Sequence, residues 1–370
     1  MSGKSKEDFQ DGNAKFVTYM NVYSNMSLDF TIVDMVKVGE DEKQNSIKYG
    51  DILFTGSSET PDDCGMSCVV TRHIDEPIYL NSFCFGFRFD DVEKFEPDFL
   101  KHYFRCIAMR KAISLTASGV TRFNVSKKRF GKIQIPLLYV SKQQEIVSHL
   151  DTFTTLISNL ESELDMRRKQ YEHYRNQLLD FEGVSGVEWK TLGDIAPYRK
   201  VRIEYSLLNV HNYVSVENLL QMKKGKVDAE KVPLDGNAIK YEMGDILVGN
   251  IRPYLKKIWL AEYDGGTNGD VLVFGIKDKN KLISKYLFYL LSSDSFFDYD
   301  NQHAKGGKMP RGDKSMIEKY LIPIPSSKTQ QEIVEKLDAF EQLIQSLETE
   351  IKLRKQQYEY YREKLLTFEK

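Results

Sequence analysis

Cysteine is scarce in this chain of 370 residues, and its four cysteines are unevenly placed. Cys64, Cys68, Cys84 and Cys106 all lie in the first third of the sequence, and their spacing matches no common zinc-binding pattern. A disulfide framework or a zinc site that held a repeated fold would recur in both halves of the chain. We therefore expect free thiols and no metal site.

Long apolar runs are also missing. No stretch approaches the roughly 18 apolar residues that identify a membrane span. Residues 1–15 are polar and charged, which is not typical of a secretory signal peptide. We therefore predict a cytoplasmic protein that does not enter a membrane.

The chain has no excess of positive charge, because 52 Lys and Arg residues face 54 Asp and Glu residues for a net charge of −2. A free-standing DNA-binding domain usually carries a clear basic excess. Either the partner is not nucleic acid, or the basic residues are concentrated locally and other subunits share the phosphate contacts.

Catalytic motifs are absent from the sequence as well. It contains no Gly-x4-Gly-Lys-Ser/Thr phosphate loop, no His-Glu-x-x-His zinc motif, and no Asn-Pro-Pro-aromatic segment of the kind that amino-methyltransferases use. Pro97-Asp98 is the nearest approach to a nuclease core, but no Glu-x-Lys follows it, and this pair is typical of a helix start. We predict a non-catalytic chain.

The most informative feature that is present is an internal repeat. Residues 143–182 and 330–369 both begin Gln-Gln-Glu-Ile-Val, and 23 of the 40 aligned positions are identical at an offset of 187. Repeats indicate the architecture of a chain before any single motif does. Two similar units, each a head followed by a stalk, are therefore expected.

The two stalks carry apolar residues at alternating steps of four and three, which is the pattern of a left-handed coiled coil. Arg167 and Arg354 fall at the same point of this pattern, each four residues after a glutamate, so we expect their stems to pack and their charges to reach water. Only residues 183–186 separate the first stalk from the second head, so no long linker permits parallel pairing. We predict one long antiparallel two-helix coiled coil with a head at each end.

The heads are related more loosely than the stalks. Residues 49–54 (YGDILF) match 243–248 (MGDILV), Gly119 matches Gly306 or Gly307, and Ile135-Pro136 matches Ile322-Pro323. Short aromatic or apolar runs bounded by Gly, Asn and Asp indicate irregular strands. The fold class is therefore α+β, with two mixed α/β heads and a pseudo-two-fold internal repeat. Because only framework residues are shared, heads that both read DNA would read different half-sites.

These motifs, in this order and repeated twice, make the whole chain similar to the specificity (S) subunit of type I restriction–modification enzymes. The resemblance implies that each head is a target-recognition domain for one half of a bipartite DNA sequence. It implies that the stalks dock two methyltransferase subunits, which carry S-adenosylmethionine, and that restriction subunits join them. It also implies that this chain itself binds no cofactor. Residues 187–195 resemble the family's opening element, for which the first head has no counterpart.

The resulting domain boundaries are a first target-recognition domain at 1–138, lacking its opening element, a first coiled-coil helix at 139–182, a second target-recognition domain at 183–325, and a second coiled-coil helix at 326–370. The alternative is a coiled-coil scaffold whose heads bind proteins rather than DNA. Near-neutral charge favours that alternative slightly.

DNA contacts require Lys, Arg and hydroxyl side chains at phosphates, and Arg, Asn, Gln and Lys at base edges. Two loops in each head carry such residues at matching positions, one after the Gly-Asp-Ile-Leu strand and one around the later glycine. The candidate DNA-binding residues are Ser57, Ser58, Thr121, Arg122, Asn124 and Lys127 in the first head and Asn250, Arg252, Tyr254, Lys256, Lys308 and Arg311 in the second. The basic run at 223–226 is predicted to be only a polar turn.

Overall fold

The structure, a computed structural model, describes residue 1 and residues 3–368. The chain divides into two compact units, of which unit 1 comprises Met1–Ser162 and Glu348–Lys370 and unit 2 comprises Glu163–Leu347. Each unit contains one head and a part of each of two long helices. Glu369 and Lys370, the predicted end of the second stalk, lie outside the described residues.

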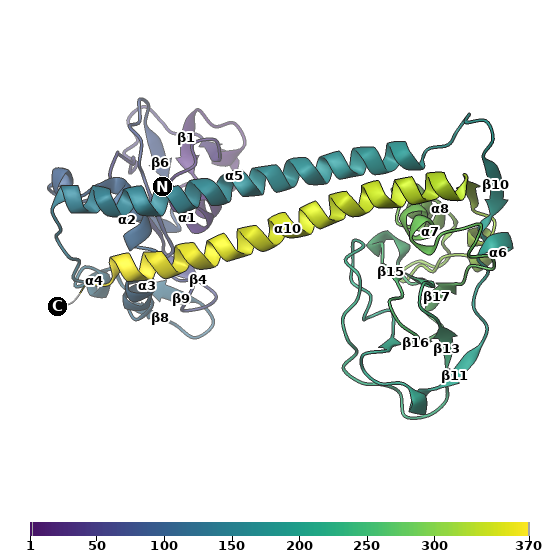
Figure 1. The fold of residues 1–370 in the computed structure, drawn as a ribbon. Coiled ribbons are helices and arrows are strands. Elements are labelled where there is room, and N and C mark those ends of the chain that lie inside the picture. Colours follow the sequence, from purple (N-terminus) through teal and green to yellow (C-terminus); the bar gives the residue numbers. More distant parts are fainter. Residues whose placement is uncertain (2, 369–370) are drawn as a thin grey trace. The chain divides into compact units, whose positions relative to one another are not determined.

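The two stalks are continuous helices, α5 (Val140–Leu179) and α10 (Ser327–Leu366), of 40 residues each (Figure 1). Both predicted helices therefore exist, with slightly shorter bounds. Helix α5 ends before residue 182 because the chain turns there and the side chain of Phe181 enters the hydrophobic core of unit 2.

The glutamine that opens each repeat has a structural task. Gln143 is fully buried, and its Nε2 donates to the carbonyl oxygens of Lys94 (2.8 Å) and Leu138 (2.9 Å). Gln330 in unit 2 is also fully buried, and it donates to the carbonyl oxygens of Lys281 and Pro325. Buried polar groups need hydrogen-bond partners. Each glutamine thus ties the start of a long helix to the loops of its own head.

In unit 1 the two long helices run antiparallel. The rings of Phe153 and Tyr361 stack with centroids 5.3 Å apart, and Lys355 forms an ion pair of 2.7 Å with Glu161. From the first contact to the second, the residue number on α5 rises while the residue number on α10 falls. The two helices therefore run in opposite directions. The predicted antiparallel pairing is therefore present in this unit.

The same pairing occurs inside unit 2. The Tyr174 and Phe340 rings stack at 5.5 Å, and the Tyr171 hydroxyl donates to Glu341 over 3.0 Å. A single coiled coil that runs through both units, with the heads at its opposite ends, stays a prediction.

The two arginines of the stalks behave as expected. Arg167 Nη2 lies 3.3 Å from Glu163 Oε1, and Arg354 Nε donates to Glu350 Oε1 over 2.7 Å. Both side chains are between one third and two fifths exposed, at 39% and 37%. Their stems lie along the helix while the charged ends reach solvent.

The head of unit 1 combines three small sheets with short helices. The sheets have strand orders β2-β1-β6, β5-β3-β7 and β4-β9-β8. Their strands are β1 (Ala14–Val17), β2 (Val33–Val36), β3 (Ile52–Thr55), β4 (Ser57–Ser58), β5 (Ser67–Val69), β6 (Ile78–Leu80), β7 (Cys84–Phe87), β8 (Ala117–Ser118) and β9 (Phe123–Val125). The helices are η1 (Lys6–Phe9), α1 (Tyr19–Ser24), η2 (Val92–Lys94), α2 (Pro97–Tyr103), α3 (Ile107–Ser114) and α4 (Lys127–Phe130).

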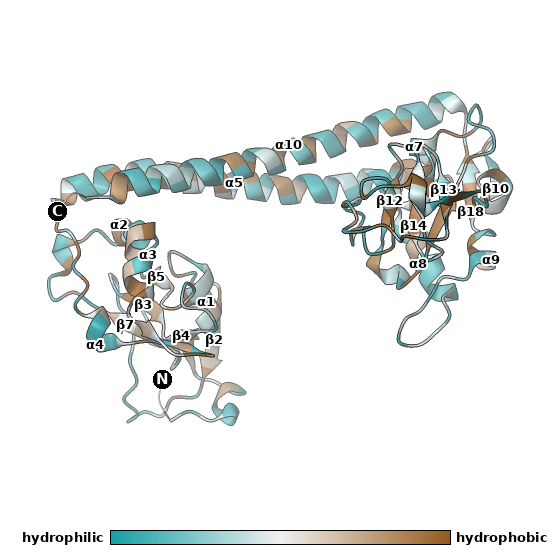
Figure 2. Ribbon diagram, turned by 90° about the horizontal axis from the view of Figure 1, so that it is seen from below, coloured by the Kyte–Doolittle hydropathy of each residue, from teal (hydrophilic) through white to brown (hydrophobic). Residues whose placement is uncertain are grey.

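The head of unit 2 also contains three small sheets, with orders β10-β18, β11-β13-β16-β12 and β15-β14-β17. Its strands are β10 (Glu188–Thr191), β11 (Arg202–Glu204), β12 (Tyr213–Val214), β13 (Asn237–Tyr241), β14 (Ile246–Gly249), β15 (Ile258–Leu260), β16 (Gly265–Thr267), β17 (Val271–Phe274) and β18 (Leu321–Ile324). Its helices are α6 (Leu192–Ile195), η3 (Tyr205–Leu207), η4 (Pro253–Leu255), α7 (Ser284–Leu291), α8 (Asp294–His303) and α9 (Lys314–Ile317). Figure 2 shows hydrophobic strands inside each head and mixed colours along both long helices.

The sheets β5-β3-β7 and β15-β14-β17 are equivalent. Ile52 pairs with Phe87 in unit 1, and Ile246 pairs with Phe274 in unit 2, both antiparallel. Both central strands are fully buried and follow a glycine with positive φ, Gly50 or Gly244. The Gly-Asp-Ile-Leu segments therefore form the central strand of each head's core, and the mixed α/β prediction is confirmed.

The opening element of the second head is strand β10, which pairs with β18 so that Trp189 faces Pro323. Farther along the chain, Arg199 binds the carboxylate of Asp245, which is 1% exposed. Its Nε and Nη2 each donate to one carboxylate oxygen over 2.9 Å. In unit 1 the equivalent Asp51 receives a similar two-armed contact from Arg88, directly after β7. Residues 131–139 of unit 1 form no strand. That the first head lacks an opening element stays a prediction, but its buried carboxylate is paired.

The four cysteines are free, and Cys64, Cys68 and Cys106 are buried. In the described part of the chain, no three His, Cys, Asp or Glu residues gather as metal ligands would. Within the same residues, no helix combines the length and apolar character needed to cross a bilayer.

Candidate nucleic-acid interface

The candidate residues Ser57, Ser58 and Asn124 of unit 1 lie on the sheet β4-β9-β8. Strand β4 pairs with β9 so that Ser57 faces Asn124, and β8 pairs with β9 so that Ser118 faces Asn124. Two segments some 60 residues apart in sequence are thus joined through their backbones. The two candidate loops of this head therefore lie side by side.

The turn between β8 and β9 carries Thr121 and Arg122, which are exposed. Arg122 Nε donates to Ser57 Oγ over 3.0 Å, so the two candidates are in direct contact. The turn depends on Gly119, whose φ is +148° and where a Cβ would lie 2.0 Å from the carbonyl oxygen of Arg122. Lys127 lies farther along and places its ammonium 5.5 Å from the ring centre of Phe85.

Unit 2 repeats this arrangement with different side chains. Ile251 forms an antiparallel bridge with Arg311, and the N–H of Arg252 donates to the carbonyl oxygen of Pro310 over 2.7 Å. Lys305 and Arg311 exchange both backbone hydrogen bonds, which closes a hairpin between them. We call residues 251–254 together with the hairpin 305–311 the hairpin face of unit 2.

Several side chains of the hairpin face are free to meet a ligand. Tyr254 is 51% exposed, the Arg311 side chain is 51% exposed, and Lys308 is also exposed. Arg311 has one weak carboxylate contact, to Asp270 at 3.4 Å. Exposed cations, and polar or aromatic side chains beside them, are groups that can contact phosphates and bases.

Two predicted contact residues have other positions. Asn250 is only 4% exposed and lies beneath the hairpin, where its carbonyl oxygen accepts from the N–H of Gly312. Lys256 donates to Asp294 Oδ1 over 2.7 Å, and its side chain is 20% exposed. In this structure these residues support the face rather than form its surface. Sequence could not show this, because Asp294 is 38 residues from Lys256.

The backbone is strained beside the hairpin face. Among the described residues, the non-glycine residues with positive φ are Met222, Lys223, Arg252 and Lys256. The N–H groups of Met222 and Lys223 donate to the carbonyl oxygens of Leu255 and Lys256, both over 2.9 Å. Such conformations cost about 1–3 kcal/mol each and cluster at functional sites. This clustering supports the assignment of the face as a site.

The basic run at 223–226 is a turn, as predicted, but its side chains are not simply solvated. Lys223 Nζ lies 3.1 Å from Asp294 Oδ1, the oxygen that Lys256 also contacts. The partly buried Asp294 carboxyl would have a raised pKa from burial, yet hydrogen bonds from Lys256 and Lys223 lower its pKa to about 2. This ion cluster fixes the two strained turns to the start of α8.

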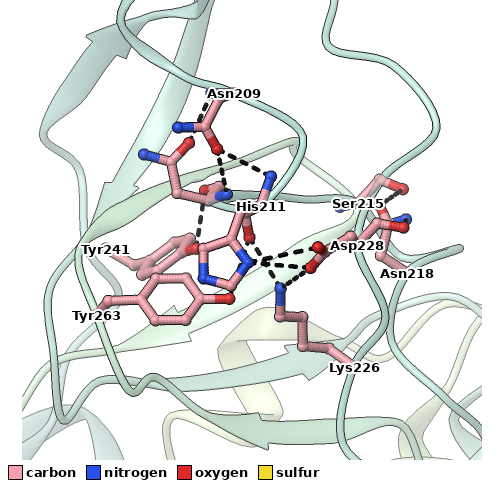
Figure 3. Close-up of polar contacts among 9 residues, drawn as sticks. Asn209, His211, Ser215, Asn218, Lys226, Asp228, Tyr241 and Tyr263 are labelled. Atoms are coloured by element: carbon pink, nitrogen blue, oxygen red, sulfur yellow. Dashed lines mark hydrogen bonds and ion pairs between the residues drawn. The ribbon is translucent and has the colours of Figure 1, made fainter.

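A cleft of about 840 Å³ in unit 2 lies next to Arg252, with Met309 of the hairpin among its lining residues. Lys226 is bonded to one of the lining residues, since it donates to Asp228 over 2.7 Å, and it lies 5.2 Å from the ring centre of Tyr263 (Figure 3). The Tyr263 ring also stacks on His211. Ser215, Asn218 and Asp228, which Figure 3 also draws, are among the residues that line the cleft.

The charge of this cleft is mixed. Its lining residues include the cations Lys231, Arg252 and Lys257 and the anions Glu217, Asp228, Glu230 and Asp270. A phosphate backbone would not be held by such a lining. The exposed cations of the hairpin are therefore better placed for phosphate contacts than the cleft is.

One residue of the site escaped the sequence reasoning. Asp300 on α8 is fully buried, and neither carboxylate oxygen has a hydrogen-bond partner. A usable signal existed, because the repeat offset of 187 places this aspartate opposite Ile113. A carboxylate that replaces an isoleucine in a buried helix position requires an explanation.

Comparison with known proteins now decides the family. A family model described as "Type I restriction modification DNA specificity domain" matches the chain twice, over residues 3–166 and 185–354. The chain belongs to this family. Specificity subunits are non-catalytic, so the expectation that this chain is not an enzyme is confirmed by its family.

Two curated specificity subunits illustrate the relationship. The type I restriction enzyme EcoR124I/EcoR124II specificity subunit of Escherichia coli is 33% identical over 247 residues, which cover 62% of this chain and 60% of that subunit. A putative type I restriction enzyme specificity subunit of Haemophilus influenzae is 30% identical over 305 residues, which cover 75% of this chain and 73% of that protein. The chain thus spans well under the full length of the first relative.

Solved structures show the same fold. The S subunit of a type I restriction–modification system from M. genitalium matches 100% of this chain and 92% of its own, with a TM-score of 0.53 and 15% identity. A structure described as the basis of complex assembly and conformational transition of the type I system gives a TM-score of 0.56 and 14% identity, covering 90% of this chain and 86% of its own. At these identities the likeness shows the fold of a specificity subunit.

Proposed function

We propose that this specificity-domain chain is the DNA-reading subunit of a cytoplasmic type I restriction–modification complex. Each head reads one half of a bipartite site in double-stranded DNA. The long helices dock two methyltransferase subunits, which hold S-adenosylmethionine, and restriction subunits complete the nuclease. The chain itself binds no cofactor.

The observation that carries this proposal is the repeated backbone arrangement with unlike side chains. Both heads join the segment after the core strand to a later glycine turn, through Ser57 and Asn124 in unit 1 and Ile251 and Arg311 in unit 2. The scaffold is the same, but one face offers hydroxyl, amide and arginine groups and the other offers arginine, tyrosine and lysine. Two readers of different half-sites would differ in this way.

A domain exchange tests the proposal. Residues 187–327 are replaced by the matching segment of a related specificity subunit, and methylated adenines are sequenced in cells that also make the methyltransferase subunit. We expect one half of the methylated motif to change and the other half to stay. A change in both halves, or in neither, contradicts the modular assignment.

A protein-binding scaffold is the competing function, favoured by the net charge of −2 and by the mixed charge of the cleft in unit 2. Salt dependence separates the two. Binding that depends on phosphates weakens steeply with salt, with a slope near −0.9 for each phosphate contact. Binding of a duplex that is insensitive to salt, or no binding by the assembled complex, would favour the scaffold.

A further inference from the structure

Unpaired buried polar atoms converge beneath the hairpin face of unit 2. Within the described residues, buried side-chain atoms without a hydrogen-bond partner include both carboxylate oxygens of Asp300, Oδ1 of Asn250 and Nε of Arg252. The point where a Cβ at Gly312 would lie is 2.2 Å from Asp300 Oδ1 and 2.9 Å from Asn250 Oδ1. Gly312 therefore leaves the space in which a carboxyl and an amide come together.

The internal repeat shows that the fold does not need a carboxyl at this place. In unit 1 the N–H of Val125 donates to the carbonyl oxygen of Gly56, just as Gly312 donates to Asn250 in unit 2. The equivalent of Asp300 is Ile113, and the point of a Cβ at Gly65 lies 2.5 Å from Ile113 Cγ2 and 3.2 Å from Val125 Cγ2. Unit 1 fills the niche with apolar atoms, whereas unit 2 fills it with polar ones.

Two neighbouring oxygen acceptors repel each other unless one of them carries a proton. The carboxyl is the group that accepts one, and burial raises the pKa of Asp300 to about 7, with His303 opposing the shift. The other titratable groups around it are Tyr198, on which Asp300 acts, and Asp313 and Glu318 at the two ends of α9, which act on the same tyrosine. No cation forms an ion pair with Asp300 in the described structure, and nearby phosphates would favour its neutral form further.

We propose that Asp300 donates a hydrogen bond to Asn250 Oδ1 and thereby positions the hairpin face of unit 2 for DNA. Asn250 links Asp300 to the hairpin. Its backbone N–H donates to the carbonyl oxygen of Asp270, and its carbonyl oxygen accepts from the N–H of Gly312 at the base of the hairpin. Arg252, two residues on, follows the same backbone. Asp300 is thus a positioning residue that does not touch DNA, and this assignment rests on the proposed function.

The proposal predicts that DNA binding retains or takes up one proton at Asp300. Affinity is then full below the pKa of the free protein and falls by at most tenfold for each pH unit above it. Asp300→Asn supplies an amide donor that does not titrate. Asp300→Ala removes the donor, and Asp298→Asn, an exposed site on the same helix, is the matched control.

The test uses the full chain assembled with its methyltransferase subunits and a duplex that carries the methylated motif. Dissociation constants are measured at fixed salt between about pH 6 and about pH 8.5. We expect wild type and Asp298→Asn to weaken about tenfold or more across this range, and Asp300→Asn to show a flat profile. Asp300→Ala should bind about tenfold more weakly even at the low-pH end.

Equal pH profiles for wild type and Asp300→Asn would overturn the inference while leaving DNA reading intact. If Asp300→Ala fails to fold, the comparison of wild type with Asp300→Asn still decides the question. A wild-type complex that binds no duplex in a sequence-dependent way would refute the proposed function itself, and with it this assignment.

Discussion

His102 Nε2 lies 2.7 Å from Asp151 Oδ1, which fastens helix α2 of the first head to α5. The other ring nitrogen lies 2.9 Å from the hydroxyl of Tyr358 on α10, so one buried imidazole bridges both long helices within unit 1. In unit 2 the hydroxyl of Tyr289 on α7 takes the same place and donates to Asp338 on α10 over 2.5 Å. The histidine of unit 1 thus contacts both long helices, whereas the tyrosine of unit 2 contacts α10 through Asp338 and Glu341.

Removing the partner of His102 should destabilise unit 1. Asp151→Ala leaves a fully buried imidazole nitrogen without a partner, which costs about 1–3 kcal/mol in the free energy of unfolding. Trp189 and Trp259 both lie in unit 2, so tryptophan fluorescence does not report on unit 1. Hydrogen exchange of the α2 amides is the suitable measurement. Exchange in α7, which belongs to unit 2, should be unchanged.

Acid should destabilise unit 1 at the same histidine, because the charged imidazolium is buried. Burial lowers the pKa of His102 below its ordinary value, so the unfolded chain takes up this proton more readily than the folded one. The stability contribution is therefore present above about pH 6.5 and is lost as the pH falls below it. Protection of the α2 amides at about pH 7.5 and about pH 5.5 measures the loss. His102→Gln should flatten this dependence, and an equal loss in the variant would assign the effect to other groups.

The arginine that pairs with Asp245 is expected to be critical for unit 2. Arg199→Ala leaves a carboxylate that is 1% exposed without its cation, and we expect a loss of about 3 kcal/mol in the free energy of unfolding. Arg199→Lys keeps the charge but loses the two-armed contact, so its loss should be smaller. Denaturant unfolding followed by Trp259 fluorescence reads out this unit. Wild-type stability in Arg199→Ala would contradict the assigned role.

The cations of the hairpin are expected to bind DNA through contacts to its phosphates. Lys308→Ala is expected to reduce the slope of log affinity against log salt by about 0.9, the value for one lost phosphate contact. Lys279→Ala, an exposed lysine in the turn before α7, is the matched control and should leave the slope unchanged. Duplex binding is measured across a salt series. A Lys308→Ala slope equal to that of wild type would exclude this contact.

The turn of the first head gives a prediction on sequence reading. A methyl group at Gly119 would lie 2.0 Å from the carbonyl oxygen of Arg122, so Gly119→Ala must displace the turn that carries Thr121 and Arg122. Gly131→Ala is the control, because its methyl group would lie 3.5 Å from the nearest atom. Adenine methylation mapped in cells should lose fidelity in one half of the motif for Gly119→Ala alone. Loss in the half that the second head reads would contradict the assignment.

The long helices were predictable because their sequence repeats a local period, and local periodicity needs no tertiary information. Gly119 and Gly306 both have positive φ, as turn glycines at matching positions require, and that the loops around them contact DNA stays a prediction. The role of each side chain was harder to predict from the sequence. Asn250 and Lys256 have the residue types of DNA contacts, yet one is covered by the hairpin and the other is held by Asp294.

The placements of these two side chains share a physical cause. Whether a polar residue faces solvent depends on segments that arrive from elsewhere in the chain, and the spacing of neighbouring residues does not encode them. Asp300 illustrates the opposite case, in which comparing the two halves of the chain gives information that a single half lacks. The equivalent residue in unit 1 is an isoleucine, so the fold accepts an apolar side chain at this position. A carboxyl group in unit 2 therefore requires an explanation.

Unit 1 includes the chain from Glu348 onward, and Tyr358 and Leu366 are buried in its hydrophobic core. During synthesis the ribosome therefore makes the first head's own sequence early but supplies the last part of its core only after all of unit 2 has been translated. Unit 2, by contrast, has all its residues once Leu347 has emerged. The head that is translated first is expected to be the last to mature, and a nascent chain stalled before residue 348 would already contain every residue of unit 2.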